Sequence, residues 1–182
     1  MSGFRLQREN AALLVVDVQE KLAAAMQPAA LERMVKRACA LVEGARVLEL
    51  PIVYTEQYPK GLGPTVAALK ERLGRQLAVE KLRFSALDER VRAQLQGRRQ
   101  VLVAGMETHI CVYQTVRALA EEGTLAVLCA DAVLSRFEVD QRVGLQLAAD
   151  TGAMVATVET ALFDLLGEAG TAEFKRISAA VR

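Results

Sequence analysis

The chain contains no tryptophan, a single histidine and few aromatic residues, which make up 4% of its 182 residues. Because single-stranded nucleic acids are bound largely by stacking on aromatic side chains, this composition disfavours such a partner. The 23 basic and 22 acidic residues leave a formal net charge of +1, which also disfavours nucleic-acid and anionic-membrane surfaces. Arg98 and Arg99 form only a two-residue basic cluster, which we expect in a solvated loop.

Long apolar stretches and secretion signals are also missing. No run approaches the roughly 18 apolar residues that a membrane span requires, and the first ten residues, MSGFRLQREN, lack the apolar core of a signal peptide. The three cysteines are an odd count, so we expect reduced thiols and a cytoplasmic protein. Cys39 lies in a helical pattern and Cys129 in a strand pattern, where both are expected to serve packing.

What the chain does have is a high hydrophobic fraction, 52%, arranged in apolar runs that alternate with helical patterns. This order predicts a single α/β domain over residues 1–182, a three-layer α/β/α sandwich around a mainly parallel sheet of the Rossmann-like type. The expected strands are Ala11–Val16, Ile52–Thr55, Leu77–Val79, Val101–Ala104, Leu125–Ala130 and Met154–Val158. The expected helices are Leu31–Leu50, Val66–Leu73, Ala86–Leu95, His109–Glu122, Val139–Thr151, Ala161–Leu166 and Ala172–Val181, with a turn-rich loop over Glu56–Pro64.

Cys111 stands out because it lies just beyond the carboxyl end of an expected strand. Gly105 is expected to end that strand, and Thr108 to cap the following helix, with Cys111 in its first turn. A helix start favours negative charge, so a thiol there is expected to ionise readily and act as a nucleophile. The alternative is a buried, inert cysteine, which is common for this residue.

Two charged residues follow other expected strands. Asp17 comes directly after Ala11–Val16, and Lys81 follows the short strand at Leu77–Val79. If both lie beside Cys111, Asp17 is expected to exchange protons with the thiol and Lys81 to stabilise the anions. Taken singly, Asp17 could be a helix cap or a turn residue, and Lys81 a surface lysine. His109, two residues from the thiol, is read as a pocket-edge or surface residue because it points to a different helix face.

These residues occur in motifs that resemble the isochorismatase-like cysteine hydrolases, especially the branch of isochorismatase domain-containing proteins. The resemblance covers nearly the whole chain and rests on five segments in order: LLVVDVQ at 13–19, TEQYPKGLGPT at 55–65, EKLRFSAL at 80–87, AGMETHICV at 104–112 and DAVLSR at 131–136. It implies the isochorismatase-like hydrolase fold and a catalytic set of Asp17, Lys81 and Cys111. It also implies a cis peptide between Met106 and Glu107, and an oxyanion hole made by the backbone amides of Glu107 and Cys111.

Departures from the family pattern narrow the expected chemistry. Nicotinamidases of this family hold a metal through a D-x-H motif and a further histidine, whereas residues 54–58 here read YTEQY and the chain has one histidine. We therefore expect no metal and no cofactor. Leu22 stands where the family has an aromatic residue soon after the first aspartate, so we expect the pocket to differ in shape from the family's. The candidate pocket residues are Gln19, Tyr54, Gln57, Tyr58 and Phe84, although Phe84 could instead be core and Tyr58 could only shape its loop.

The expected function is hydrolysis of a C–N bond in a small carboxamide or carbamoyl substrate through a thioester on Cys111. One alternative is vinyl-ether hydrolysis of an isochorismate-like acid, in which the cysteine takes no part, and another is a non-catalytic oligomeric binding protein. The resemblance also implies a homo-oligomer. Apolar residues of the last two helices offer a candidate surface for it, namely Leu162, Leu165, Phe174, Ile177 and Val181.

Overall fold

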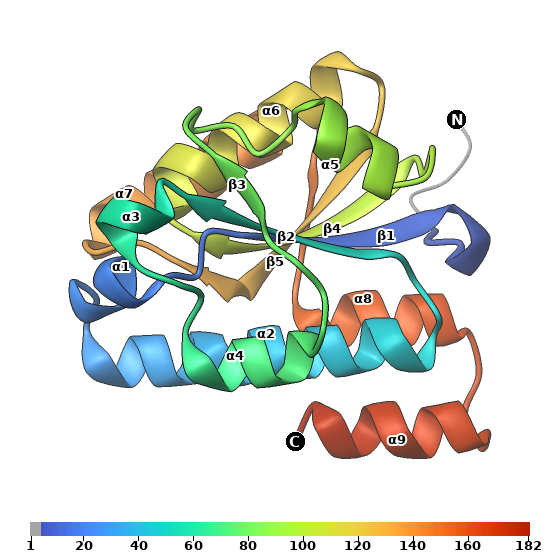
Figure 1. The fold of residues 1–182 in the computed structure, drawn as a ribbon. Helices are drawn as coiled ribbons and strands as arrows, with labels where there is room; N and C mark the ends of the chain where they lie inside the picture. The colour runs from blue at the N-terminus through green and yellow to red at the C-terminus, as the bar shows by residue number, and fades with distance from the viewer. Residues whose placement is uncertain (1–4) are drawn as a thin grey trace.

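The fold is built on a twisted parallel sheet with helices on both faces (Figure 1). The computed structural model describes residues 5–182; Met1–Phe4, the start of the N-terminal segment discussed above, lie outside the described residues. Within the described part, six strands pair in the order β3-β2-β1-β4-β5-β6, and every pairing is parallel. The strands are β1 (Ala11–Val16), β2 (Ile52–Gln57), β3 (Val79–Lys81), β4 (Gln100–Met106), β5 (Leu125–Leu134) and β6 (Met154–Ala156).

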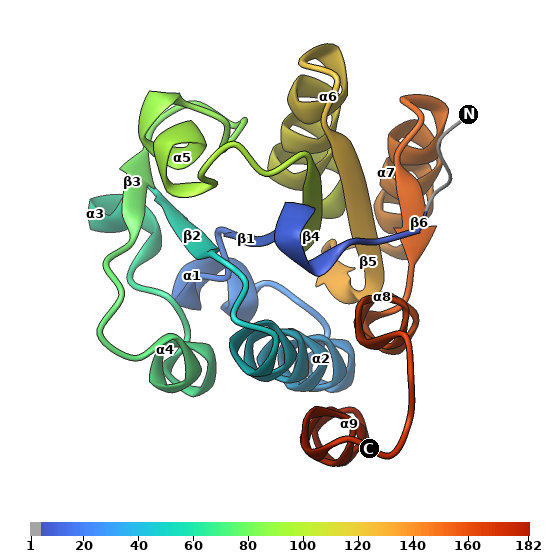
Figure 2. The ribbon, with the colours of Figure 1, turned by 90° about the vertical axis from the view of Figure 1, so that its right-hand side faces the viewer.

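Helices cover the sheet as two layers, which Figure 2 separates clearly. On one face lie α5 (Glu89–Gln94), α6 (Tyr113–Glu121) and α7 (Glu138–Asp150). On the other lie α2 (Pro28–Val47), α4 (Ala67–Leu73) and α8 (Val158–Leu166), with α9 (Ala172–Ala180) outside α2 and α8. The short elements are η1 (Arg8–Asn10), α1 (Glu20–Ala24), α3 (Pro59–Leu62) and the π-helical turn η2 (Thr108–Val112).

The central strands are apolar throughout because both of their faces are covered. In β1 all six residues are buried, and successive side chains enter different cores. Leu13 and Val15 join the cluster under α2 and α8, whereas Leu14 and Val16 join the cluster under α5 and α6. Each fully buried Leu or Val contributes roughly 1.5–3 kcal/mol of transfer free energy. Because both faces of β1 are buried, a polar residue such as Asp17 fits only beyond the end of the strand.

The predicted three-layer α/β/α architecture is confirmed, with differences at element ends. The expected strand after residue 76 forms at Val79–Lys81, so Lys81 is its last residue rather than its successor. Gly105 does not end β4: it lies within the strand with φ +133°, and a Cβ there would stand 1.9 Å from the Val16 carbonyl oxygen. The expected loop over 56–64 contains α3, and α1 follows β1 in a segment for which no element was predicted.

The C-terminal helices do not provide the predicted oligomer surface. Four of the five named side chains are buried, and Phe174 packs edge-to-face on Phe163 with ring centroids 5.9 Å apart. The buried four are Leu162, Leu165, Ile177 and Val181. Because α8 and α9 use their apolar faces against α2 and the sheet, the expectation that these helices present a free patch is wrong.

No helix within residues 5–182 is both long and apolar enough to cross a bilayer.

Candidate functional site

The candidate site lies at the carboxyl edge of the sheet, where β1 and β2 run toward α1 and α3 (Figure 1). Asp17 follows β1 directly and has a left-handed backbone, φ +50°. Non-glycine residues seldom adopt this conformation, and it is found most often at functional sites. The turn places the fully buried Asp17 side chain beside Thr55 of β2 and Lys81 of β3. Open α/β sheets bind their ligands at this edge.

Asp17 and Lys81 form a buried ion pair. The Lys81 ammonium lies 2.5 Å from Asp17 Oδ2, and the two side chains are 4% and 0% exposed. Lys81 also donates to Gln57 Oε1 at 2.8 Å and to the backbone carbonyls of Arg83 and Phe84 at 3.1 and 3.0 Å. Because a desolvated ammonium requires acceptors for its protons, these contacts fix its position and offset part of the burial cost.

The Asp17 carboxyl is held between opposing influences. Burial raises its pKa above the ordinary value, whereas the charge and hydrogen bond of Lys81 lower it. Hydrogen bonds from Thr55 and from the Cys111 thiol also favour the charged carboxylate; the Thr55 hydroxyl donates to Oδ1 at 2.7 Å. The balance leaves the pKa raised, so this carboxylate is a stronger base than an exposed one.

Cys111 lies in the π-helical turn η2 that follows β4. The Met106–Glu107 peptide between them is cis, as the resemblance implied. Thr108 does not cap this helix: Glu107 occupies the cap position, no side chain caps the turn, and the buried Thr108 hydroxyl has no hydrogen-bond partner. Single π turns inside helices are frequent at functional sites. The turn brings the Cys111 thiol within hydrogen-bonding reach of Asp17.

The Cys111 thiol is not readily ionised, contrary to the expectation from a helix start. Its pKa is raised to about 12, first because the side chain is buried and second because the Asp17 carboxylate repels a thiolate. Lys81 acts in the opposite direction but does not overcome these two causes. The expectation considered helix charge and lysine alone, and it was wrong because desolvation dominates for a residue that is 6% exposed.

Glu107 and Arg136 stabilise the segment around the cysteine. The buried Glu107 carboxylate accepts hydrogen bonds from the Arg136 backbone N–H at 3.1 Å and from its Nε at 3.0 Å. Thr115 of α6 links η2 to the segment after β3, donating to the Cys111 carbonyl at 2.6 Å and accepting from Ala86 N–H at 2.9 Å. These contacts join β5, α6 and the Lys81 segment to one turn.

The five pocket candidates separate into three groups. Gln19 is fully buried, and its side-chain amide hydrogen-bonds the backbone of Gln57 and Gly63. Gln19 therefore holds the two ends of the loop that contains α3. Tyr54 packs in the core under α2, and its hydroxyl donates to the backbone carbonyl of Gln76. Its side chain therefore lies on the sheet face that α2 covers, and it is not a pocket residue. Gln57, which binds Lys81, is a direct neighbour of the ion pair. Tyr58 and Phe84, 52% and 54% exposed, stand near it on the surface.

Two partners escaped the sequence analysis. Thr55 is opposite Val16, the residue before Asp17, in the sheet register that the structure shows. Arg136 was visible only as part of a motif. His109, expected at a pocket edge or on the surface, is half-buried and hydrogen-bonds Ser135 Oγ through Nδ1 at 3.0 Å. Within the described residues, no group of three or more His, Cys, Asp or Glu side chains is arranged to hold a metal.

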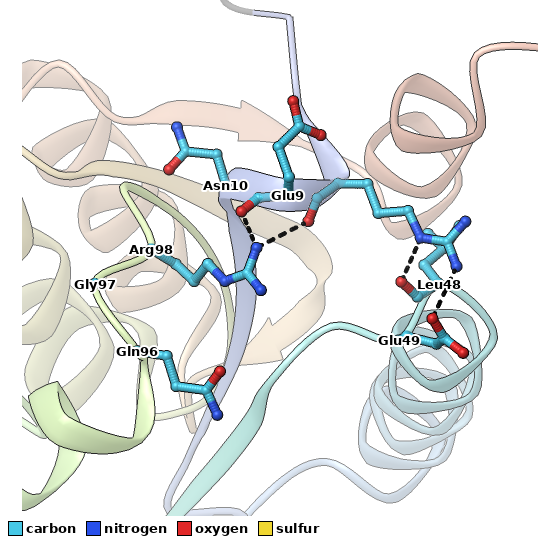
Figure 3. A pocket seen from close by; sticks show the side chains of 8 residues that line it. Glu9, Asn10, Leu48, Glu49, Gln96, Gly97 and Arg98 are labelled. Atoms are coloured by element: carbon cyan, nitrogen blue, oxygen red, sulfur yellow. Dashed lines mark hydrogen bonds and ion pairs between the residues drawn. The ribbon is translucent and has the colours of Figure 1, made fainter.

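A surface depression at the opposite, amino end of the sheet is separate from this site (Figure 3). As expected from sequence, Arg98 and Arg99 lie in a loop, between α5 and β4; Arg99 is exposed, whereas the partly buried Arg98 donates from its guanidinium to the carbonyls of Glu9 and Arg8. Arg8 in turn donates to the Leu48 carbonyl at 2.6 Å and lies 3.7 Å from Glu49. These arginines connect loops at the amino end, and neither contacts the Asp17–Lys81 pair.

Comparisons with known proteins agree with this architecture. Residues 11–160 match the family model for the isochorismatase domain. Isochorismatase domain-containing protein 2A of Mus musculus is 35% identical over 181 residues, covering 98% of this chain and 85% of its own. Isochorismatase domain-containing protein 1 of Salmo salar is 39% identical over 140 residues, which are 75% of this chain; the aligned region spans about half, 49%, of that relative.

Solved structures show the same fold. A MAR1 ribonuclease from Caenorhabditis elegans superposes with a TM-score of 0.91 at 33% identity, covering 97% of this chain and 92% of that one. YcaC from Escherichia coli, described as an octameric hydrolase of unknown specificity, superposes with a TM-score of 0.84 at 23% identity, covering 100% and 89%. Because the family model spans most of the sequence, the chain belongs to the isochorismatase family.

Proposed function

We propose that this protein is a hydrolase that cleaves a C–N bond of a small carboxamide or carbamoyl substrate through a thioester on Cys111. The observation that carries the proposal is one buried carboxylate, Asp17, which lies 2.5 Å from the Lys81 ammonium and close enough to the Cys111 thiol for each group to shift the other's pKa. A nucleophile, a base and a cation are thus gathered in one place, an arrangement suited to acyl transfer.

In the first half-reaction the Cys111 thiol attacks the substrate carbonyl carbon as Asp17 accepts the thiol proton. Because the thiol pKa is about 12, proton transfer and attack proceed together rather than from a standing thiolate. The backbone N–H groups of Glu107 and Cys111 are the proposed donors to the oxyanion. Asp17 then gives the proton to the leaving nitrogen, and the C–N bond breaks to release ammonia or an amine and leave the thioester.

In the second half-reaction water attacks the thioester carbonyl while Asp17 accepts a proton from it. The C–S bond breaks as the new C–O bond forms, and the proton returns to the Cys111 sulfur. Lys81 remains bonded to Asp17 and stabilises each charged state of this carboxylate. The net reaction consumes one water and needs no metal or redox cofactor.

Burial of the three groups supports a small substrate, because Asp17, Lys81 and Cys111 are 0%, 7% and 6% exposed. Tyr58 and Phe84 are the candidates for apolar contacts at the entrance. A folded nucleic acid would need exposed cationic groups around the thiol, whereas Lys81 is already committed to four acceptors. We therefore also propose a small-molecule partner, not a nucleic acid, for this site.

The test is a screen of small primary amides and ureas for ammonia release. The proposal requires activity that Cys111→Ala abolishes and that Cys39→Ala, a change at the half-exposed thiol of α2, retains. Trapping of an acyl group on Cys111, read by mass spectrometry of the quenched enzyme, identifies the thioester.

Two further arms separate the alternatives. Pyruvate release from isochorismate that persists in Cys111→Ala would favour vinyl-ether hydrolysis with a bystander cysteine. Cleavage of a single-stranded RNA that depends on Asp17 would instead align this chain with the protein described as a ribonuclease. Inactivity of the folded protein on all three substrate classes favours the non-catalytic binding protein.

A further inference from the structure

The proposed reaction leaves His109, the single histidine of the chain, without a role. This residue lies in η2, midway between Glu107 and Cys111, whose backbone N–H groups are the proposed donors to the oxyanion. Its imidazole makes two contacts outside η2, with Ser135 and with Asp140. A side chain in this position can control where both amides and the thiol stand.

The first contact joins the imidazole to the end of β5. His109 Nδ1 lies 3.0 Å from Ser135 Oγ, and Ser135 is 4% exposed. Ser135 comes directly after Leu134, which pairs with Met106 at the last position that β4 and β5 share. Because a buried hydroxyl without a partner is unfavourable, this hydrogen bond opposes movement of η2 away from β5.

The second contact determines which imidazole nitrogen carries the proton. His109 Nε2 lies 3.8 Å from Oδ2 of Asp140, in the first turn of α7. A carboxylate favours a proton on the nitrogen that faces it, so Nδ1 of the neutral imidazole is left to accept from the Ser135 hydroxyl. His109 therefore connects η2 to the end of β5 and to α7 at the same time.

No other side chain in the middle of η2 makes such a connection within residues 5–182. The two ends of the turn are anchored at Glu107 and Cys111 by hydrogen bonds with other segments. Between them, the Thr108 hydroxyl has no partner and Ile110 is apolar. The hydrogen bond of His109 is therefore the one polar side-chain contact that holds the middle of the turn.

We propose that His109 is a positioning residue, which fixes η2 through its hydrogen bond with Ser135 and so keeps the Cys111 thiol and the two proposed oxyanion donors in place. The proposal rests on the proposed role of Cys111 as nucleophile, and it gives His109 no contact with the reacting atoms. A displacement of about 1 Å can lower a rate roughly 100-fold. Loss of the hydrogen bond is therefore expected to lower kcat rather than to raise KM.

Two amide substitutions separate the contacts of the imidazole. The amide oxygen of His109→Asn can replace Nδ1 and accept from Ser135, whereas the longer side chain of His109→Gln carries its amide to the position of Nε2, toward Asp140. His109→Ala, His109→Gln and Ser135→Ala should each lower kcat for ammonia release by about 10-fold or more, with KM unchanged within about twofold. His109→Asn should retain about half of kcat or more. The double variant of His109→Ala and Ser135→Ala should lose no more than either single variant.

Alkylation by iodoacetamide tests the turn without any hydrolysis. Cys111 is 6% exposed, and a turn released from Ser135 opens more often to the reagent, whereas the fully buried Cys129 of β5 is labelled only on wider unfolding. His109→Ala and Ser135→Ala should label Cys111 roughly fivefold faster, the factor that one lost hydrogen bond gives to an opening equilibrium. His109→Asn should restore the slow rate. Peptide mapping by mass spectrometry reads both thiols, and Ser178→Ala, on α9, is the control that should change neither.

Three results would overturn the proposal. They are an unchanged rate of Cys111 labelling in folded His109→Ala, an equal gain in the labelling of Cys129, and a His109→Asn variant that behaves like His109→Ala. An unchanged kcat in a variant whose Cys111 labels faster would overturn it as well. If His109→Ala does not fold, Ser135→Ala takes its place in each comparison. Absence of ammonia release from the unmodified protein counts against the proposed function alone, because the labelling rates decide the role of His109 independently.

Discussion

Replacing Lys81 by methionine should destabilise the protein strongly at neutral pH and less in acid. The Lys81 and Asp17 side chains are 4% and 0% exposed, so the substitution leaves a buried carboxyl without its cation. Removing one partner of such a pair costs about 3–5 kcal/mol. With a urea dependence of about 2 kcal/mol per molar, the unfolding midpoint should fall by roughly 1.5–2.5 M.

The pH dependence follows from the Asp17 pKa. It is already raised in the folded protein, and it rises further in Lys81→Met because both the charge and the hydrogen bond of Lys81 lower it. Because the Asp17 carboxyl has a higher pKa in the folded protein than in the unfolded chain, where the value is ordinarily 3.8, the folded protein binds the proton more tightly. The free energy of unfolding is therefore highest below the unfolded pKa and declines as the pH increases toward the folded pKa. Between the unfolded and the folded pKa of Asp17, the free energy of unfolding of Lys81→Met should therefore fall by up to about 1.4 kcal/mol for each pH unit.

Urea unfolding followed by circular dichroism at several pH values measures these effects. Adding Asp17→Asn to Lys81→Met removes the buried charge and should recover most of the lost free energy. Lys60→Met, at an exposed lysine, is the control and should change stability by less than about 0.5 kcal/mol. A loss in Lys81→Met that is the same at every pH, or that Asp17→Asn fails to reverse, would refute the reasoning.

Three further predictions concern β4 and the turn η2 that follows it. The difference in ultraviolet thiolate absorbance between the unmodified protein and Cys111→Ala should stay flat from about pH 6 to about pH 9, because the thiol pKa is about 12; a step in that range would contradict it. Gly105→Ala should cost more than about 4 kcal/mol in urea unfolding, since its Cβ would stand 1.9 Å from the Val16 carbonyl oxygen. Thr108→Val should be neutral or stabilising by up to about 1 kcal/mol, because the buried hydroxyl has no partner; destabilisation by more than that would indicate an unseen one.

The layers of the fold were predictable because they depend on local patterns. Ala11–Val16 is buried on both faces in the structure, and an uninterrupted apolar run of that length is what such a strand requires. Element ends were less predictable because they depend on tertiary contacts. Gly105 illustrates this: in sequence it signals a break, but in the sheet it allows β4 to continue past the Val16 carbonyl.

The positions of the candidate site residues along the sheet edge were predictable from the sequence, but the burial and pKa values of their side chains were not. Asp17 follows β1 and Lys81 ends β3, at the same edge of the sheet with β2 between them, and their places at strand ends made them candidates for contact. The direction of Tyr54 also followed from alternation, since its partner Val15 faces the core under α2, but the pocket assignment did not use this signal. The pKa of Cys111 was not predictable, because burial is set by elements distant in the sequence.

The raised thiol pKa changes how the reactivity of this site is controlled. A standing thiolate would react with any electrophile or oxidant that reached it, whereas a thiol with a pKa of about 12 is almost entirely protonated at neutral pH. In the proposed mechanism, Asp17, whose own pKa is raised, accepts the proton only as a substrate carbonyl draws electron density from sulfur and donors receive the oxyanion. Under that proposal, burial suppresses the nucleophilicity of Cys111 in the free protein and ties it to the bound substrate. The position of Lys81 follows from the same logic: it contacts the base rather than the thiol, so it holds Asp17 in place without creating a permanent thiolate.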